Sequence, residues 1–340
     1  MTPHPKAFIC GCKGLSLDAQ ERALIALHQP WGLILFKRNV DAPEQVAALV
    51  ASFREIVGRD DAPVLIDQEG GRVQRMGPPH WPAYPAAARF HQLPGGYEAQ
   101  SEAALLNARI MAADLAAVGI NVNCTPVLDV PAPGSHNIVG DRAYGTDPQA
   151  IAGLGLAVCQ GMLAQGVLPV IKHIPGHGRA KADSHLELPR VNASRKELET
   201  TDFAPFQMLN HMPLGMTAHV VYEAIDPDRP ATTSPLVVEK IIRGHIGFRG
   251  LLMSDDLSMK ALSGDFADRA RAVFAAGVDI ALHCNGDWAE TEPVAMAAPV
   301  LAGKSLKRAQ RALKFLKMPL EPLDLVDARA RIHLMLAGSA

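Results

Sequence analysis

The residues best suited to acid–base chemistry are concentrated in one segment, KHIPGHGRAKADSHLELP, at residues 172–189. Five of its side chains can bind a polar ligand or move a proton: Lys172, His173, His177, Asp183 and His185. An apolar run, residues 167–171, precedes the segment and predicts a buried strand. The PGHG sequence excludes helix and strand, so these polar groups are expected on a loop at the carboxyl end of that strand. Loops at that end carry the active sites of parallel α/β proteins.

The spacing of Asp183 and His185 favours a catalytic pair. A single loop histidine is more often a surface or structural residue than a catalytic one. In an extended segment, however, side chains two residues apart point to the same side and can hydrogen-bond. An aspartate in this position selects the imidazole tautomer and raises the basicity of the ring.

Short apolar runs recur along the chain at the spacing of βα units. Eight runs are candidate strands: 7–10, 32–36, 63–67, 120–129, 168–172, 215–219, 251–255 and 278–283. The clearest helix is expected at 41–58, where Asp41 and Glu44 are suited to a capping box and Gly58 to a helix stop. Ser194 with Glu197, and Ser234 before a proline, predict two further helix starts.

Eight such units predict an α/β fold of the TIM type, a (β/α)8 barrel. The alternative, a doubly wound sheet, usually carries a glycine-rich nucleotide fingerprint, and the sequence has none. Residues 305–340 are expected to form extra C-terminal helices on the outside of the barrel. The sequence contains no linker and no repeat, so residues 1–340 are interpreted as a single catalytic domain.

Polar residues follow most of the predicted strands where each strand ends, and in a barrel they would meet in one mouth. A polar residue in this position can also be a helix cap or a surface group, but the coincidence recurs at six strands. The residues are Asp67, Asp129, Lys172 with His173, His219, Asp255, and His283 with Asn285.

Two further segments offer groups that could hold a substrate. DQEGGRVQR, residues 67–75, has two glycines that let the backbone approach a ligand, and it supplies Asp67 and Arg75. DRAYGTD, residues 141–147, is a polar turn before a helix that Asp147 and the following proline begin. Its Arg142 is either a clamp on the substrate or a solvated surface residue.

Composition narrows the class of protein. The 340 residues are 48% hydrophobic and 20% charged, and the net charge of −2 indicates neither nucleic acid nor an anionic membrane as a partner. The first ten residues lack a signal-peptide pattern and no run is long enough to span a membrane, so a soluble cytoplasmic protein is expected. Five cysteines, an odd number, are interpreted as reduced structural thiols, because Cys10 and Cys12 alone supply too few ligands for zinc.

Three motifs resemble a known family. KHIPGHG followed by DSH, together with DQEGGRVQR and SDDLSM, is similar to the β-N-acetylglucosaminidases of glycoside hydrolase family 3, the single-domain bacterial enzymes of peptidoglycan recycling. The resemblance extends from Asp67 to Asp255, more than half of the chain. Ile174 stands where an aromatic residue is usual.

The resemblance implies a function and a role for each matching residue. It implies a retaining exo-β-N-acetylglucosaminidase that acts on small sugars derived from peptidoglycan, the 1,6-anhydro-muropeptides, without a cofactor or a metal. Asp255 matches the nucleophile, His185 the general acid/base and Asp183 its orienting partner. Five residues match those that hold the N-acetylglucosamine unit: Asp67, Arg75, Arg142, Lys172 and His173.

The residue chemistry agrees with these roles, but it leaves one assignment open. Retaining hydrolysis needs a carboxylate nucleophile and a proton donor on opposite faces of the anomeric carbon. Asp255 and Asp256 point to opposite faces of a strand, so spacing alone does not select between them. The resemblance favours Asp255, which leaves Asp256 to bond the backbone of the following turn.

Two other enzyme classes, and a barrel that only binds a ligand, are the alternatives. The histidines at 173, 177, 185 and 219, with Asp255 and Lys172, could be metal ligands of an amidohydrolase barrel. That class has a His-x-His after its first strand, however, where this chain has Gly11 and Cys12. A glycoside phosphorylase would use phosphate in place of water, and a neutral histidine repels phosphate less than a carboxylate does. A barrel that only binds would need neither a nucleophile nor an acid/base. The expected partner is a small carbohydrate, and a monomer is the simplest expectation.

Overall fold

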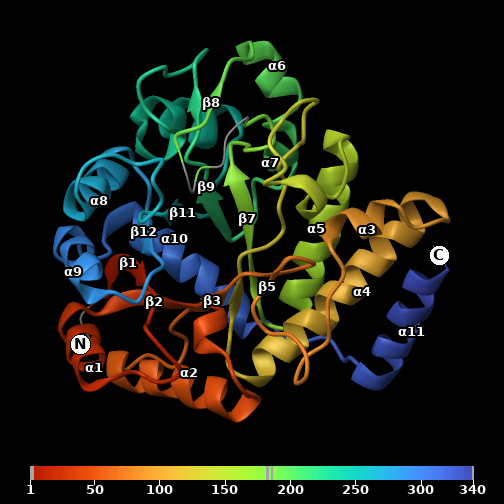
Figure 1. Ribbon diagram of the computed structural model, residues 1–340, viewed down its shortest axis with the longest axis horizontal. Helices are drawn as coiled ribbons and strands as arrows, with labels where there is room; N and C mark the ends of the chain where they lie inside the picture. The colour runs from red at the N-terminus through yellow and green to blue at the C-terminus, as the bar shows by residue number, and fades with distance from the viewer. Residues whose placement is uncertain (1–3, 181–183, 185–186, 339–340) are drawn as a thin grey trace.

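The computed structural model describes residues 4–180, 184 and 187–338. Eight parallel strands close into a barrel in the order β1-β12-β11-β9-β7-β6-β3-β2, and helices surround it (Figure 1). The barrel strands are β1 (Lys6–Cys10), β2 (Pro30–Leu35), β3 (Val64–Ile66), β6 (Val122–Asn123), β7 (Leu168–Ile174), β9 (Leu214–Thr217), β11 (Leu251–Asp256) and β12 (Ile280–His283). The prediction of a TIM-type α/β barrel is confirmed.

Two small sheets lie on connections outside the barrel. A hairpin forms in the segment after β3, and a parallel pair joins the segments that follow β7 and β9. The strands of these sheets are β4 (Gln68–Gly70), β5 (Val73–Gln74), β8 (Arg190–Val191) and β10 (Val221–Tyr222).

Helices follow the barrel strands along the chain. The α-helices are α1 (Ala19–His28), α2 (Pro43–Val57), α3 (Ala87–His91), α4 (Gly96–Ala117), α5 (Pro148–Ala164), α6 (Arg195–Thr200), α7 (Ala204–Met208), α8 (Phe266–Ala275), α9 (Trp288–Ala297), α10 (Gly303–Lys314) and α11 (Leu325–Ala337). Shorter or irregular turns are η1 (Lys37–Asn39), η2 (Gly140–Arg142), η3 (Ala231–Thr233), the π-helix η4 (Val237–His245) and η5 (Phe315–Lys317).

Alternation along the strands divides the apolar residues into two clusters. In β1, Ala7 and Ile9 belong to the cluster inside the barrel, whereas Phe8 and Cys10 belong to the cluster between the strands and the helices. Because both faces of each strand are covered, the strands are apolar throughout instead of alternating with polar residues. This explains why they stand out in the sequence as continuous hydrophobic runs.

The start of helix α2 differs from the prediction. The helix begins at Pro43 with Ala42 as its N-cap and no side-chain cap, so Asp41 and Glu44 form no capping box. Proline suits the first helical position, because its fixed φ is helical and its missing N–H would be unbonded there in any case. The predicted stop is correct, since Gly58 has a φ of +61°.

The fourth predicted strand, 120–129, is much shorter than expected. Only Val122 and Asn123 form β6, although the chain continues beside β7 and Val127 forms a bridge with Lys172. Pro126 has no N–H with which to extend the ladder, which interrupts the regular pairing. Asp129 therefore lies on an extended continuation instead of at a strand end.

The C-terminal segment forms two helices as predicted, and they pack at different places on the barrel. Helix α10 packs across the end of the barrel at which the strands begin, and its Ala309 and Ala312 join the interior cluster with Leu301. Helix α11 packs on α4 instead, near the C-terminus in Figure 1. The extra C-terminal helices are present as predicted, and α10 lies against one end of the barrel.

Candidate active site

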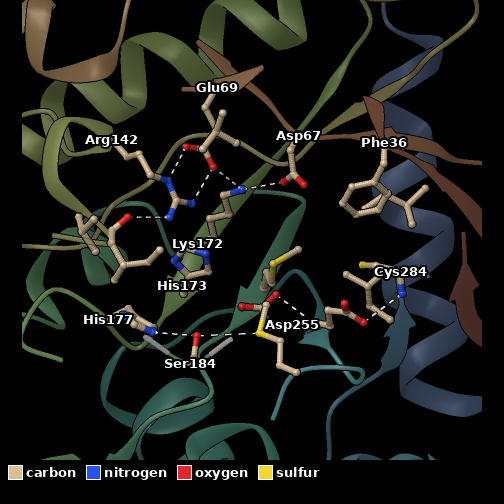
Figure 2. A pocket seen from close by; sticks show the side chains of 18 of the residues that line it. Phe36, Asp67, Glu69, Arg142, Lys172, His173, His177, Ser184, Asp255 and Cys284 are labelled. Carbon is tan, nitrogen blue, oxygen red and sulfur yellow. Dashed lines mark hydrogen bonds and ion pairs between the residues drawn. The ribbon is translucent and has the colours of Figure 1, made fainter. Parts of the chain in front are cut away.

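A cavity of about 190 Å³ opens at the carboxyl ends of the barrel strands, where the sequence predicts the mouth. Its wall contains charged groups from four strand ends and their loops (Figure 2). The lining residues are Ile34, Phe36, Asp67, Glu69, Arg72, Val73, Arg75, Ile138, Val139, Arg142, Lys172, His173, His177, Ser184, Met216, Asp255, Asp256, Met259, Leu282 and Cys284.

Lys172 is the central cation of this wall. It lies on β7 and is 2% exposed, and its Nζ donates to Asp67 Oδ1 at 2.9 Å and contacts Glu69 Oε1 at 2.7 Å. Burial alone would lower the pKa of Lys172, but the two carboxylates raise it well above its ordinary value. Lys172 is therefore a permanent ammonium, and its two partners stay ionised because it lowers their pKa values in turn.

Arg142 is clamped by Glu69 through a two-pronged ion pair. Its Nε and Nη2 donate to the two carboxylate oxygens of Glu69, both at 2.8 Å, and its Nη1 donates to the carbonyl of Ile138. The two side chains are 11% and 5% exposed. Of the two interpretations of Arg142 in the sequence, the solvated surface residue is therefore wrong. Paired guanidinium and carboxylate groups of this kind are rigid and directional.

Arg75 is held between a carboxylate and an aromatic ring. Its Nη2 donates to Asp67 Oδ2 at 3.1 Å, and its guanidinium carbon lies 5.1 Å from the centroid of the Phe36 ring. Gly70 and Gly71 shape the turn that brings Arg75 back to the cavity, both with φ in the left-handed region. A Cβ on Gly70 would lie 2.2 Å from the carbonyl oxygen of Pro85, so only glycine fits there.

His173 is oriented by a buried carboxylate behind it. Its Nδ1 lies 2.7 Å from Asp129 Oδ2, and Asp129 Oδ1 accepts from the backbone N–H groups of His173 and His177. Burial would raise the pKa of Asp129, but the two histidines and these bonds lower it to about 2. With Nδ1 directed at the carboxylate, Nε2 is the ring nitrogen left for a ligand in the cavity that His173 lines.

The two neighbouring aspartates at the end of β11 differ in how many partners they already have. Asp255 is 8% exposed, and its Oδ1 accepts from the backbone N–H of Asp256 at 2.8 Å. Burial would raise the pKa of Asp255, but His173, His219, that N–H and Lys172 lower it overall. Asp255 is therefore an ionised carboxylate in the cavity wall near neutral pH.

Asp256 is engaged in the turn that follows. Its Oδ1 accepts from the backbone N–H groups of Ser258 and Cys284, both at 3.0 Å, and its Oδ2 accepts from Ser258 Oγ at 2.5 Å. These bonds connect β11 to the end of β12. The bonding to the following turn agrees with the expectation from the sequence.

The predicted acid/base pair, Asp183 and His185, lies outside the residues that the structure describes. Ser184, between them in the sequence, is described and is 3% exposed. Its Oγ lies 3.3 Å from His177 Nε2 (Figure 2). The same Oγ lies 3.9 Å from Met259 Sδ. Burial lowers the pKa of His177 to about 4, so His177 is a neutral ring at pH 7.

Two other histidines predicted at the mouth are not in the cavity wall. His219 is fully buried, with Nδ1 2.7 Å from Thr232 Oγ1 and Nε2 3.0 Å from the carbonyl oxygen of Asp256. His283 points to Asn285 instead, at 3.0 Å. Both are structural, and no three His, Cys, Asp or Glu side chains of the described residues are grouped as a metal ion requires.

Two site residues were not among those singled out from the sequence for substrate binding. Glu69 fixes both Arg142 and Lys172, and Phe36 lies beneath Arg75. For Glu69 a signal was present, because it is two residues after Asp67 in DQEGG and so lies on the same side of an extended chain. For Phe36 there was no such signal.

The closed barrel has, at the carboxyl ends of its strands, a cavity whose wall combines fixed ion pairs with the ionised carboxylate of Asp255. The family model of the glycosyl hydrolase family 3 N terminal domain matches residues 11–329. The chain therefore belongs to glycosyl hydrolase family 3 and is a glycoside hydrolase, as the motifs predicted.

Individual relatives agree with this assignment. The beta-hexosaminidase of Alkalilimnicola ehrlichii is 40% identical over 282 residues, covering 81% of this chain and 79% of the relative. The beta-hexosaminidase of Pseudomonas aeruginosa is 40% identical over 288 residues, covering 84% and 83%.

Solved structures show the same similarity along nearly the whole chain. NagZ from Neisseria gonorrhoeae, in complex with N-trifluoroacetyl-D-glucosamine, has a TM-score of 0.85 and 30% identity, covering 99% of this chain and all of its own. A family 3 beta-N-acetylglucosaminidase from Paenibacillus sp. has a TM-score of 0.83 and 29% identity, covering 97% of this chain and 67% of its own. Among the described residues, no helix is long and apolar enough to cross a membrane.

Proposed function

We propose that this chain is a retaining exo-β-N-acetylglucosaminidase with Asp255 as its nucleophile. The observation that carries the proposal is the difference between the two adjacent aspartates: Asp255 is ionised in the cavity wall, whereas Asp256 is engaged in three hydrogen bonds of the next turn. A nucleophile needs an ionised oxygen that is free to reach the reacting carbon. Both aspartates line the cavity, but both oxygens of Asp256 already accept hydrogen bonds, whereas among the described residues only Oδ1 of Asp255 does.

We propose that Asp67, Arg75, Arg142, Lys172 and His173 hold the terminal sugar. Lys172 and the two arginines offer N–H donors that their carboxylate partners already hold in place, so little side-chain freedom is lost on binding. The cavity of about 190 Å³ is smaller than the roughly 300–1,000 Å³ typical of drug-sized ligand sites. This size favours one sugar unit and therefore cleavage at the end of a chain.

The proposed reaction has two steps. In the first, an oxygen of Asp255 forms a bond to the anomeric carbon while the glycosidic C–O bond breaks, and His185 gives its proton to the leaving oxygen. In the second, His185 takes a proton from water, the water oxygen attacks the anomeric carbon, and Asp255 leaves as a carboxylate. Asp183 would orient the imidazole in both steps.

The proposed substrates are peptidoglycan-derived sugars, the 1,6-anhydro-muropeptides, from which the enzyme would remove a non-reducing terminal β-linked N-acetylglucosamine. The support is the likeness to NagZ, whose structure was solved with an N-acylated glucosamine. We also propose that residues 1–340 form one catalytic domain that works in the cytoplasm. All five cysteines are free and buried, which suits a reducing compartment.

One assay tests the activity and its stereochemistry. A chromogenic N-acetyl-β-glucosaminide is hydrolysed while NMR follows the anomeric proton of the first product, in the presence and absence of phosphate. We expect free N-acetylglucosamine with the β configuration in both conditions. An α product would rule out the covalent route, and sugar 1-phosphate formed only with phosphate would make the enzyme a phosphorylase.

A further inference from the structure

A second cavity, of about 370 Å³, lies at the end of the barrel opposite the mouth. It lies between the end of η4, the loop that leads into β11, and helix α10. Strand β11 runs from Leu251 beside this cavity to Asp255 at the mouth, about 13 Å at the rise of a strand. Eight residues line it, and six of them are cations. The cations are Arg243, Arg249, Lys304, Lys307, Arg308 and Arg311, and the other two residues are Gly247 and Phe248.

One buried carboxylate behind this wall is already fully used. Asp279 Oδ2 accepts from Arg243 Nη2 at 2.7 Å and from the N–H of Leu252 at 3.0 Å. Its Oδ1 accepts from Ser305 Oγ at 2.6 Å and Arg308 Nη1 at 2.8 Å. Asp279 is 2% exposed, so it fixes the two arginines in place but has no oxygen to spare for the other four cations.

The other four cations have no carboxylate partner among the described residues. Arg249, Lys304, Lys307 and Arg311 are exposed, and the one hydrogen bond of their side chains that the structure describes runs from Arg311 to the carbonyl oxygen of Arg249. Six positive charges against one negative charge leave a surplus of five in a chain whose net charge is −2. This surplus is therefore local, and mutual repulsion makes it costly unless an anion neutralises it.

Arg243 responds to the positive potential of this cavity, and α10 adds to it. Burial lowers the pKa of Arg243 to about 10, and the positive charges of Arg308 and Arg311 lower it further, against the attraction of Asp279. The Nε of Arg243 is buried and has no hydrogen-bond partner among the described residues. Helix α10 begins beside the cavity at Gly303 without a side-chain cap, so its first N–H groups and the positive end of its dipole add to the same field.

We propose that this cavity binds a small anion that carries two or more phosphoryl groups. Fixed guanidinium groups bind phosphate in a bidentate manner, and mobile lysines at the rim suit a ligand with several charges. The ring of Phe248 is 1% exposed and Arg243 lies over it at 5.4 Å, so the described residues offer no open aromatic face for a nucleobase in this cavity. The recognised part is therefore the phosphoryl chain, whether free or attached to a nucleoside.

Binding of tripolyphosphate measured by calorimetry, at constant ionic strength, tests this site. The test variant is Lys304→Gln/Lys307→Gln/Arg311→Gln, and the control variant Lys196→Gln/Arg271→Gln/Lys317→Gln removes the same charge from exposed positions elsewhere. We expect saturable binding to the wild type and to the control variant, with dissociation constants within about twofold of each other. Binding to the test variant should be at least about tenfold weaker, which corresponds to roughly 1.4 kcal/mol, because three of its positive charges are gone. All three proteins should hydrolyse the chromogenic glycoside alike, which shows that the test variant is folded.

Three further measurements, with ATP, N-acetylglucosamine and lipid vesicles, identify which kind of anion binds and at which end of the barrel it binds. ATP should bind about as tightly as tripolyphosphate, and N-acetylglucosamine should displace neither, because the mouth is at the other end of the barrel. Displacement by the sugar would place the anion in the mouth and overturn the proposal, and much tighter binding of ATP would show that a base is recognised after all. Three other results would also overturn the proposal. They are equal weakening of tripolyphosphate binding in both triple variants, no saturable binding, and binding only to phosphatidylglycerol vesicles.

Discussion

At the scale of single residues, hydrogen-bond saturation separates side chains that could take part in chemistry from those that hold the fold. Asp256, His219 and Asp279 have their polar atoms bonded to backbone or neighbouring side chains. Asp255 is bonded through one oxygen to the next residue and lines the cavity with its carboxylate. The same contrast predicts opposite results for substitutions at adjacent positions.

Asp255→Asn is expected to reduce kcat by at least about a thousandfold while the free energy of unfolding changes little, since the carboxylate would be needed to form the covalent intermediate. Asp256→Asn is the matched control. It replaces one acceptor oxygen by an NH₂ group among three donors and should destabilise the fold by about 1–3 kcal/mol. Kinetics and urea unfolding of both variants check this, and an active Asp255→Asn enzyme would reverse the assignment.

The acid/base role of His185 predicts a dependence on the leaving group. His185→Ala should lose about 10²–10⁴ in kcat on disaccharides but much less on an aryl glycoside with an acidic phenol, which needs no proton. Azide should restore turnover on the aryl glycoside by attacking the glycosyl-enzyme without a base, and Asp183→Ala should show a weaker form of this pattern.

The matched control is His177→Gln, because His177 is a neutral buried ring in the same cavity wall. Its effect should be the same for every leaving group, and azide should change nothing. If His185→Ala behaved like this control, His185 would be a binding or structural residue.

At the scale of elements, the mouth depends on segments that meet only in the folded barrel. Gly178, after β7, passes so close to Val130 that a Cβ would lie 2.0 Å from its carbonyl oxygen. The next residue, Arg179, donates to Asp202 at 2.6 Å and to Glu197 at 2.8 Å. These bonds join the chain that follows β7 to α6 and to the turn before α7. The glycines in PGHG therefore serve close packing as well as breaking the strand.

The pair of Glu69 on β4 and Arg142 on η2 is expected to be strongly coupled, because both charges are buried. In a double-mutant cycle with Glu69→Gln and Arg142→Met, each single substitution should cost about 3–5 kcal/mol and the double variant much less than the sum. Urea unfolding measures the cycle.

The chain offers a matched control that joins the same two segments at the surface. Arg72 and Asp141 pair at 2.9 Å, but their side chains are 43% and 50% exposed. Their coupling energy should be at most about 1 kcal/mol, because solvent screens exposed pairs. Equal coupling in the two cycles would show that burial does not govern the Glu69 pair.

At the scale of the whole molecule, the barrel is closed at one end by α10 and open at the other to the substrate cavity. The closing helix shares its apolar side with the barrel interior and presents cations to the second cavity. One helix thus completes the core and also forms one wall of the proposed anion site.

Ala309→Asp should destabilise the whole barrel, because it places a carboxylate without a partner in the interior cluster, where Ala309 is 2% exposed. We expect a loss of more than about 3 kcal/mol in urea unfolding followed by circular dichroism. Gln310→Asp introduces the same residue at the next, exposed position of the helix and should stay within about 0.5 kcal/mol of the wild type. Equal effects would show that α10 does not seal the barrel.

The sequence by itself determined the eight strands, the barrel and the family, because continuous apolar runs, glycine stops and local motifs are properties of neighbouring residues. It missed the length of β6, where Pro126 interrupts the ladder, and the cap of α2. Only the tertiary structure decided which charges pair across long separations, such as Glu69 with Arg142, 73 residues apart. It also brought residues 243–249 and 304–311 together into a basic cavity that the net charge of the chain conceals. The physical reason is that such pairings follow from barrel closure and strand register, which place distant residues side by side without leaving a local pattern in the sequence.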